Sequence, residues 1–129
     1  MAESIIDKYL NIPFREDGKD FDGVYCYGLC QLFYKIEKNI VLPETFELQK
    51  LCERIQAPEK HCFVTFTDLC SKGQSHIGIM IDDIRFLHIS NNLKRSIPFP
   101  VIEKMTNRIW KMRLYGYFRI KKNANIDRI

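Results

Sequence analysis

Two short alternating segments, residues 75–81 and 85–90, constrain the fold of this chain most strongly. In both segments apolar side chains alternate with other types, which predicts two β-strands. The alternating apolar residues are Ile77, Ile79, Ile81, Leu87 and Ile89. Because one face of an antiparallel pair must bury its apolar side chains together, these residues fix the strand register. A three-residue loop at 82–84 then joins the strands into a hairpin.

The same register brings two of the three histidines of the chain together. His76 and His88 fall on the face opposite the isoleucines, as direct or diagonal neighbours across the strand pair. The pattern therefore predicts an imidazole pair on this hairpin.

A cysteine begins the strongest predicted helix. Apolar residues at helical spacing run from Leu29 to Ile40, and the helix is expected to start near Cys26. Unpaired N–H groups and the helix dipole stabilise a thiolate at such a start, and the same N–H groups are candidate oxyanion donors. Gly28 leaves room for another segment to approach the start of the helix.

The order of predicted elements indicates an α+β fold, with N-terminal helices packed on a central antiparallel β-sheet. Helices are expected at 4–10, from 26 to 40 and at 44–55, with a loop at 13–23. Strands are expected at 62–67, 75–81, 85–90, 94–97 and 109–120. The 129 residues contain no internal repeat or linker, so we expect a single domain spanning 1–129.

Composition narrows the functional classes. The chain is 46% hydrophobic and 28% charged, as in ordinary globular proteins, and contains neither a secretory signal nor a membrane-length apolar run. We therefore expect synthesis in the cytoplasm and no membrane partner. Five cysteines, an odd number at irregular spacing, favour core thiols over a disulfide framework, and zinc is a weaker alternative.

The net charge of +4 is concentrated toward the C-terminal end. Only Asp127 opposes the basic residues Lys104, Arg108, Lys111, Arg113, Arg119, Lys121, Lys122 and Arg128. Such an end suits an acidic partner, or it is simply a solvated strand and tail. We do not expect nucleic acid as the partner.

Cys26, His76 and His88 together supply the groups of an acyl-transfer site. Cys26 is the candidate nucleophile, His76 the base that activates it, and His88 the polar group that orients His76. This chemistry needs no metal or cofactor. Two alternatives stay open: a core cysteine with hydrogen-bonded surface histidines, and a zinc ion held by the same three residues.

Several motifs resemble the NlpC family of papain-like cell-wall cysteine peptidases. Segment Gly23–Leu29 is similar to the glycine, nucleophilic cysteine, glycine and leucine signature of that family. Segment His76–His88 resembles its second block, in which the base and a third polar residue stand twelve positions apart. The chain departs from the pattern at Tyr25, where the family has aspartate, at Phe14, where it often has tyrosine, and at the hairpin tip.

The resemblance implies a papain-like fold and hydrolysis of an amide in a peptidoglycan stem peptide, through a thioester on Cys26. The implied bond joins D-glutamate to diaminopimelate. Phe14, Tyr25, Tyr27 and Asp22 are candidate substrate-binding residues, although packing for the tyrosines and loop capping for Asp22 are alternatives.

Within the family the chain is most similar to the phage tail-assembly branch. That branch often has an aromatic residue after the cysteine, as Tyr27 here, and tends to end on a tryptophan strand, here with Trp110, and a sequence like Gly116–Arg119. This implies other phage tail proteins as partners and delivery to the cell wall on a phage tail or virion. Two further functions remain open. One is a tail assembly protein with this fold and little catalysis, and the other is an amidase or acyltransferase that acts on a protein substrate.

Overall fold

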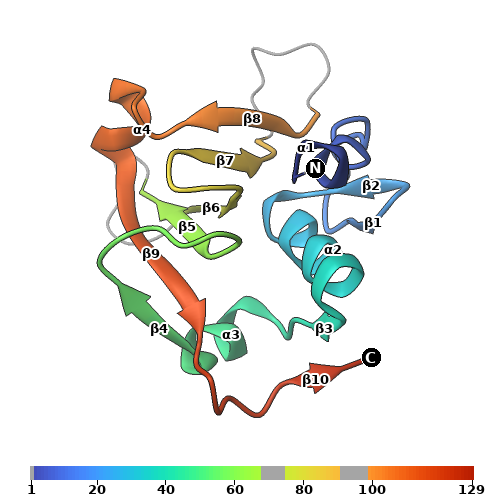
Figure 1. Cartoon of the computed structure of the whole chain (residues 1–129). Coiled ribbons are helices and arrows are strands. Elements are labelled where there is room, and N and C mark those ends of the chain that lie inside the picture. Colours follow the sequence, from blue (N-terminus) through green and yellow to red (C-terminus); the bar gives the residue numbers. More distant parts are fainter. Residues whose placement is uncertain (1, 68–74, 91–98) are drawn as a thin grey trace.

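The computed structural model describes residues 2–67, 75–90 and 99–129 (Figure 1). The helices are α1 (Ala2–Asp7), α2 (Cys26–Lys38), α3 (Thr45–Leu51) and α4 (Arg108–Arg113). The strands are β1 (Lys19–Asp20), β2 (Gly23–Val24), β3 (Ile40–Val41), β4 (Cys52–Ile55), β5 (Phe63–Phe66), β6 (His76–Met80), β7 (Arg85–His88), β8 (Val101–Lys104), β9 (Leu114–Ile120) and β10 (Asp127–Arg128).

A six-stranded sheet forms the centre of the molecule. Its strand order is β4-β9-β5-β6-β7-β8, and all neighbouring strands run antiparallel. Two small antiparallel pairs, β1 with β2 and β3 with β10, lie outside it. The predicted α+β fold, with N-terminal helices on an antiparallel sheet, is confirmed.

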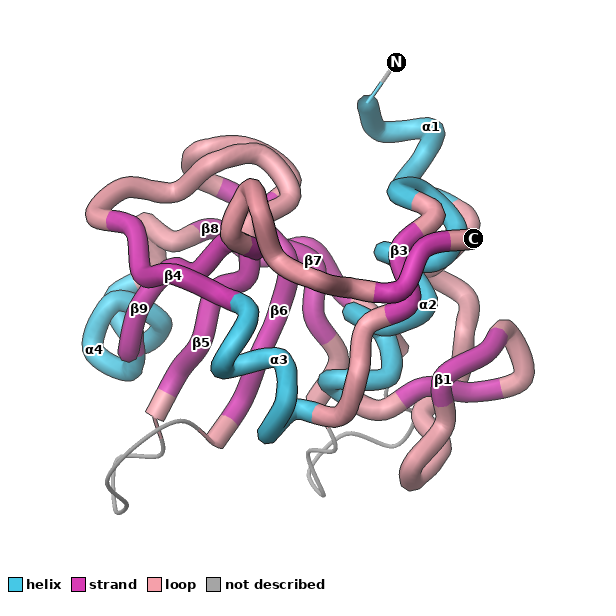
Figure 2. The backbone as a smooth tube through the Cα atoms, turned by 90° about the horizontal axis from the view of Figure 1, so that it is seen from below, coloured by secondary structure: helices cyan, strands magenta, loops and turns pink. Residues whose placement is uncertain are grey.

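Both faces of the sheet are covered, by different elements. Helix α2 packs against β6, over a core that includes Phe33, Ile79 and Leu87. The other face carries a second cluster around Phe66 and Phe86, which Trp110 of α4 covers. Figure 2 shows α2 and α4 at opposite ends of the sheet. The hairpin therefore lies between two apolar layers, with His88 buried and His76 partly buried.

Gly28 allows a close approach at the start of α2, as expected from the sequence. A Cβ atom at this position would lie 1.8 Å from the carbonyl oxygen of Gly18. The same carbonyl accepts a hydrogen bond from the N–H of Tyr25, at 3.1 Å. The loop before β1 is thus held against the first turn of α2, which fixes the position of Cys26.

Two predicted segments change type along their length. The helix expected at 44–55 stops at Leu51, because residues 52–55 form β4 and pair with β9. The strand expected at 109–120 begins with α4, since the side chain of Asn107 accepts hydrogen bonds from the N–H groups of Ile109 and Trp110 and caps a helix there. Both corrections are cases in which partners distant in sequence, or a cap, override local propensity.

Two smaller differences from the expected elements concern α1 and β8. Helix α1 ends at Asp7, and hydrogen-bonded turns follow it to Ile12. Strand β8 was not predicted, although it completes the sheet beside β7. The strand expected at 94–97 lies outside the described residues. Among the helices of the described segments, none has both the length and the apolar character needed to cross a bilayer.

Candidate active site

The thiol of Cys26 is half-buried at the first residue of α2. Burial raises the pKa of this thiol, while hydrogen bonds from the backbone N–H groups of Ile77, Tyr27 and Cys26 itself lower it. Burial is the larger effect, so the pKa lies above its ordinary value. The helix start does favour the thiolate, as expected, but the apolar surroundings outweigh it and the resting thiol is protonated.

His76 and His88 form a hydrogen-bonded pair. The register pairs Ile79 with Leu87, and one step further along the strands His88 lies opposite Gly78, diagonal to His76. Nε2 of His76 is 2.7 Å from Nδ1 of His88. The predicted proximity of the two imidazoles is confirmed, in its diagonal form.

Aromatic rings enclose this imidazole pair. Trp110 stands edge-on to His88, with the ring centres 4.8 Å apart, and also stacks near His76. Burial is the main reason that the pKa of His76 falls to about 3, and the electrostatic effects of His88 and Arg113 lower it further, against an opposing effect of Glu103. His76 is therefore a neutral imidazole at physiological pH.

A carboxylate that the sequence analysis did not identify completes the chain of polar groups. Oε2 of Glu103, on β8, lies 2.5 Å from Nε2 of His88. His88 is only 2% exposed, so this contact is largely screened from water. The adjacent β-branched residues Val101 and Ile102 after Pro100 were the available signal for a strand here, and assigning that strand would have placed Glu103 beside the hairpin.

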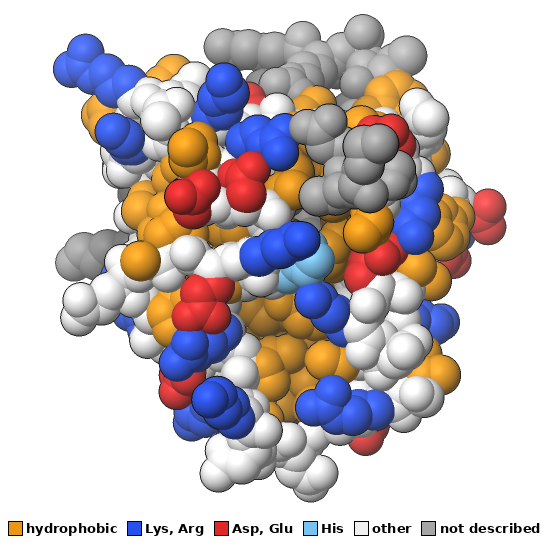
Figure 3. All heavy atoms as spheres, in the orientation of Figure 1, with side chains coloured by type: hydrophobic (Ala, Val, Ile, Leu, Met, Phe, Trp, Pro, Cys, Tyr) orange, Lys and Arg blue, Asp and Glu red, His pale blue; other side chains and the backbone are white. Residues whose placement is uncertain are grey.

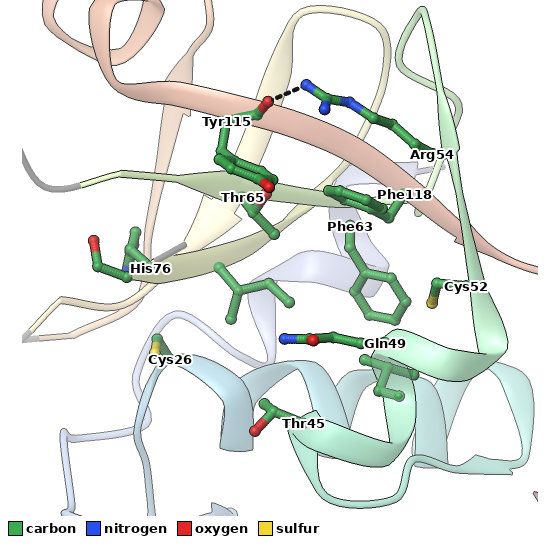
Figure 4. Close-up of a pocket in the computed structure, with 13 residues that line it drawn as sticks. Cys26, Thr45, Gln49, Cys52, Arg54, Phe63, Thr65, His76, Tyr115 and Phe118 are labelled. Carbon is green, nitrogen blue, oxygen red and sulfur yellow. Dashed lines mark hydrogen bonds between the residues drawn. The ribbon is translucent and has the colours of Figure 1, made fainter. Parts of the chain in front are cut away.

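An open cleft of about 340 Å³ lies between α3, the sheet and the start of α2. It is lined by Cys26, Thr45, Leu48, Gln49, Cys52, Arg54, Phe63, Thr65, Ser75, His76, Ile77, Tyr115 and Phe118. Figure 4 shows Cys26 and His76 at the same end of this cleft, on elements that face each other. The other end is formed by Arg54, Tyr115 and Phe118. The candidate nucleophile and base thus share one elongated, solvent-accessible groove.

Arg54 is the one charged side chain among the lining residues. Its guanidinium donates a hydrogen bond to the carbonyl of Tyr115, at 2.5 Å, and lies 5.3 Å from the ring centre of Tyr115 and 5.9 Å from that of Phe118. These contacts hold a positive charge at a fixed place in the wall of the cleft.

The four candidate substrate-binding residues lie elsewhere. Tyr27 is 1% exposed and its hydroxyl donates to the carbonyl of Pro43, so it packs in the core, which is the alternative that the sequence left open for it. Phe14 and Tyr25 pack against the core, and Asp22 is exposed beside the β1–β2 turn. None of the four is among the residues that line the cleft. The cleft wall comes instead from α3, β4 and β9, which the sequence analysis did not connect with the site.

The other cysteines show no sign of reactive or metal-binding thiols within the described residues. Burial raises the pKa values of Cys30, Cys52 and Cys62, with Cys52 and Cys62 each reaching about 11, while Cys70 lies outside the described residues. Within residues 2–67, 75–90 and 99–129, no three His, Cys, Asp or Glu side chains are arranged to hold a metal ion.

One of the basic side chains near the C-terminus is neutralised by carboxylates on neighbouring segments. Arg119 pairs with Glu53 and Glu59, at 2.6 and 2.5 Å. In Figure 3 lysines and arginines are scattered among acidic and apolar groups over the face shown. This distribution fits the solvated alternative better than a single acidic partner.

Comparisons with known proteins agree with this geometry. The model of the NlpC/P60 family matches residues 11–119, so the chain belongs to the NlpC/P60 family. No curated protein sequence matches the chain.

Three solved structures have similar folds. The first is a lipoprotein-like NLP/P60 family protein from Staphylococcus aureus, with TM-score 0.69, 21% identity and coverage of 95% of this chain and 42% of the other. The second is an NlpC/P60 family protein from Bacillus cereus, with TM-score 0.70, 20% identity and coverage of 93% and 40%. The third is the NlpC/p60 domain of the peptidoglycan hydrolase SagA, with TM-score 0.58, 13% identity and coverage of 94% and 98%.

These matches show that the chain shares one domain with the three proteins, and not that it shares their full length. This chain spans about two fifths of the length of the first two structures. At such identities the likeness extends to the fold. Neither the family match nor these structures distinguish a phage tail branch.

Proposed function

We propose that this protein is a cysteine peptidase that hydrolyses an amide bond in a peptidoglycan stem peptide, with Cys26 as nucleophile. The observation that carries the proposal is the His76–His88 hydrogen bond at the same end of a cleft as the Cys26 thiol. Membership of the NlpC/P60 family and the likeness to a peptidoglycan hydrolase domain support the substrate class. The specific bond proposed is the one between D-glutamate and diaminopimelate.

The reaction starts from a neutral thiol and a neutral imidazole. Nε2 of His76 is engaged by His88, so Nδ1 is the nitrogen left to serve Cys26. As sulfur attacks the substrate carbonyl carbon, Nδ1 takes the thiol proton, and the backbone N–H groups at the start of α2 stabilise the oxyanion. His88 holds the ring of His76 in orientation during the transfer.

Collapse of the tetrahedral intermediate breaks the carbon–nitrogen bond. Nδ1–H of His76 protonates the departing amine, and the acyl group stays on Cys26 as a thioester. In the second half Nδ1 takes a proton from water, and the resulting hydroxide attacks the thioester. Collapse of this second tetrahedral intermediate breaks the carbon–sulfur bond, and Nδ1–H returns its proton to the departing thiolate. The products are a free carboxylic acid and the regenerated thiol. The cleft beyond Cys26 has room for an extended peptide, and the guanidinium of Arg54 offers a partner for a substrate carboxylate.

Digestion of purified sacculi tests this proposal. Soluble muropeptides with a newly freed amine on diaminopimelate should appear with the unaltered protein and disappear with Cys26→Ala, a loss of about 10⁴-fold or more. Cys52→Ala is the matched control, since Cys52 lines the same cleft, and it should retain activity. Equal release by both variants would overturn the role of Cys26. A thioester without muropeptide release would instead indicate an acyltransferase on another substrate.

Delivery to the wall on a phage tail is a separate part of the proposal, and it rests on the sequence resemblance of residues 116–119 to the phage tail-assembly branch. Particles purified from a producing host should contain the protein, detected by mass spectrometry of tail fractions. Its presence there without any release from sacculi by the same particles would identify a structural tail component that lacks the peptidase activity.

A further inference from the structure

The catalytic histidines are followed by a carboxylate on the neighbouring strand. Strand β8 pairs with β7 so that Val101 lies opposite His88 and Glu103 opposite Phe86. Glu103 is therefore the diagonal neighbour of His88 on the same face of the sheet. Its Oε2 atom lies 2.5 Å from Nε2 of His88.

The three side chains form a line of hydrogen bonds that ends at the cleft. It runs from Glu103 Oε2 to His88 Nε2, and from His88 Nδ1 to His76 Nε2. His88 is 2% exposed and the Glu103 side chain is 26% exposed, so the middle of the line is buried and the carboxylate end is partly exposed. The two contacts of His88 use different nitrogens of its ring. The position of the proton on His88 therefore determines the position of the proton on His76.

A carboxylate can only accept, and this determines the direction of the line. His88 must carry a proton on Nε2 to donate to Glu103, which leaves Nδ1 of a neutral His88 as an acceptor. That acceptor takes the proton on Nε2 of His76. Nδ1 of His76 is then left unprotonated, with its lone pair available to the thiol of Cys26.

We propose that Glu103 is a positioning residue that holds His88 in the tautomer protonated at Nε2 and thereby keeps Nδ1 of His76 unprotonated. This deepens the proposed function and rests on it. Aromatic packing cannot select the tautomer of His88, because Trp110 and Phe86 fix the plane of its ring without distinguishing its two nitrogens. Without the carboxylate, His88 is able to carry its proton on Nδ1 and donate to His76, which moves the proton of His76 to Nδ1 and removes the base.

The tautomer can be measured without a substrate. Two-bond nitrogen–proton NMR correlations of histidine rings distinguish a proton on Nδ1 from one on Nε2. At pH 7 the unaltered protein should show both His76 and His88 protonated at Nε2. Glu103→Ala should shift both rings measurably toward the Nδ1-protonated form. An unchanged tautomer pattern in Glu103→Ala overturns the proposal, whether or not the protein acts on sacculi.

Kinetics provide the second readout. Outer groups that orient a histidine typically contribute about 10–100-fold. Glu103→Ala should lower kcat by about that factor with KM within about twofold, and Glu103→Gln should recover most of the loss because its carbonyl accepts the same proton. A change in KM alone would assign Glu103 a merely structural role. Equal losses of kcat in the alanine and glutamine variants, with unchanged tautomers, would do the same.

Two further variants distinguish a positioning role of Glu103 from an effect on the stability of the fold. Glu53→Ala removes another edge-strand glutamate, which lies on β4 and pairs with Arg119 of β9, and should change neither the tautomers nor kcat. Should Glu103→Ala fail to fold, Glu103→Met removes the acceptor at nearly constant volume and makes the same test. If Cys26→Ala retains activity on sacculi, the proposed function fails, while the NMR result still decides the tautomer question.

Discussion

The backbone N–H of Ile77, the residue that follows His76 on β6, lies close enough to the thiol of Cys26 to lower its pKa. This contact joins the start of α2 directly to the strand that carries the candidate base. It also stabilises a thiolate when one forms, although burial keeps the resting pKa of the thiol above its ordinary value. With the pKa of His76 at about 3, both partners are neutral at rest, and no thiolate–imidazolium pair exists before substrate binds.

The first prediction concerns the alkylation of Cys26. Because the thiolate is the nucleophile, iodoacetamide labelling should be slow at pH 6–7 and should rise about tenfold per pH unit to beyond pH 9. His76→Ala should leave this profile unchanged below pH 7. Peptide mass spectrometry measures each cysteine separately, with N-acetylcysteine as the free-thiol reference. A fast plateau at pH 5–6 that His76→Ala abolishes would contradict the neutral resting state.

The second prediction concerns stability in mild acid. The pKa of His76 is about 3 in the folded protein and about 6.5 when unfolded, so the unfolded chain binds the extra proton first. The stability that depends on a neutral His76 is complete above pH 6.5 and is lost as the pH falls toward 3. Between pH 6 and 5 this residue alone should lower the free energy of unfolding by roughly 1 kcal/mol per pH unit.

Urea unfolding of the unaltered protein and of His76→Gln measures this difference. The glutamine variant should show a slope smaller by about that amount between pH 6 and 5, and the same slope above pH 7.5. His61, whose pKa falls to about 4 chiefly through burial, contributes to both proteins and cancels in the comparison. Identical slopes in the two proteins at pH 5–6 would show that His76 is not buried in its neutral form.

The sequence predicted the structure best where a short periodic pattern of apolar residues had to be buried on one face. The alternation in 76–89 predicted the hairpin, its three-residue loop and the meeting of His76 with His88, because a shift by one residue would turn the isoleucines away from the core. The start of α2 at Cys26 was predicted in the same way, from apolar spacing along the helix.

The parts that were missed depend on partners distant in sequence. Strand β4 exists because β9, more than sixty residues later, supplies its hydrogen bonds, as in the pairing of Ile55 with Tyr117. The cleft wall around Arg54 and Tyr115 follows from that pairing and has no local signature. The raised pKa of Cys26 depends on burial, which only the assembled fold determines.

The third prediction concerns the cationic wall of the cleft. Arg54→Gln should raise KM by about 5- to 20-fold with little change in kcat, as expected for a charge-assisted hydrogen bond worth roughly 1–2 kcal/mol at a partly solvated site. Arg119→Gln is the matched control, because Arg119 pairs with Glu53 and Glu59 and does not line the cleft. Steady-state kinetics on soluble stem peptides measure both. Equal effects in the two variants would indicate a general charge effect and not a contact with substrate.

The last prediction concerns Tyr27, whose substitution should affect stability and not catalysis. The Tyr27 hydroxyl donates to the carbonyl of Pro43, in a region closed to solvent. Tyr27→Phe removes that hydrogen bond and leaves a buried carbonyl without this donor, so it should lower the free energy of unfolding by roughly 0.5–1.5 kcal/mol. Because Tyr27 does not line the cleft, kcat and KM should stay within about twofold of the unaltered protein. Denaturant unfolding and steady-state kinetics on one preparation measure both quantities. A raised KM at unchanged stability would instead assign Tyr27 to the substrate-binding surface.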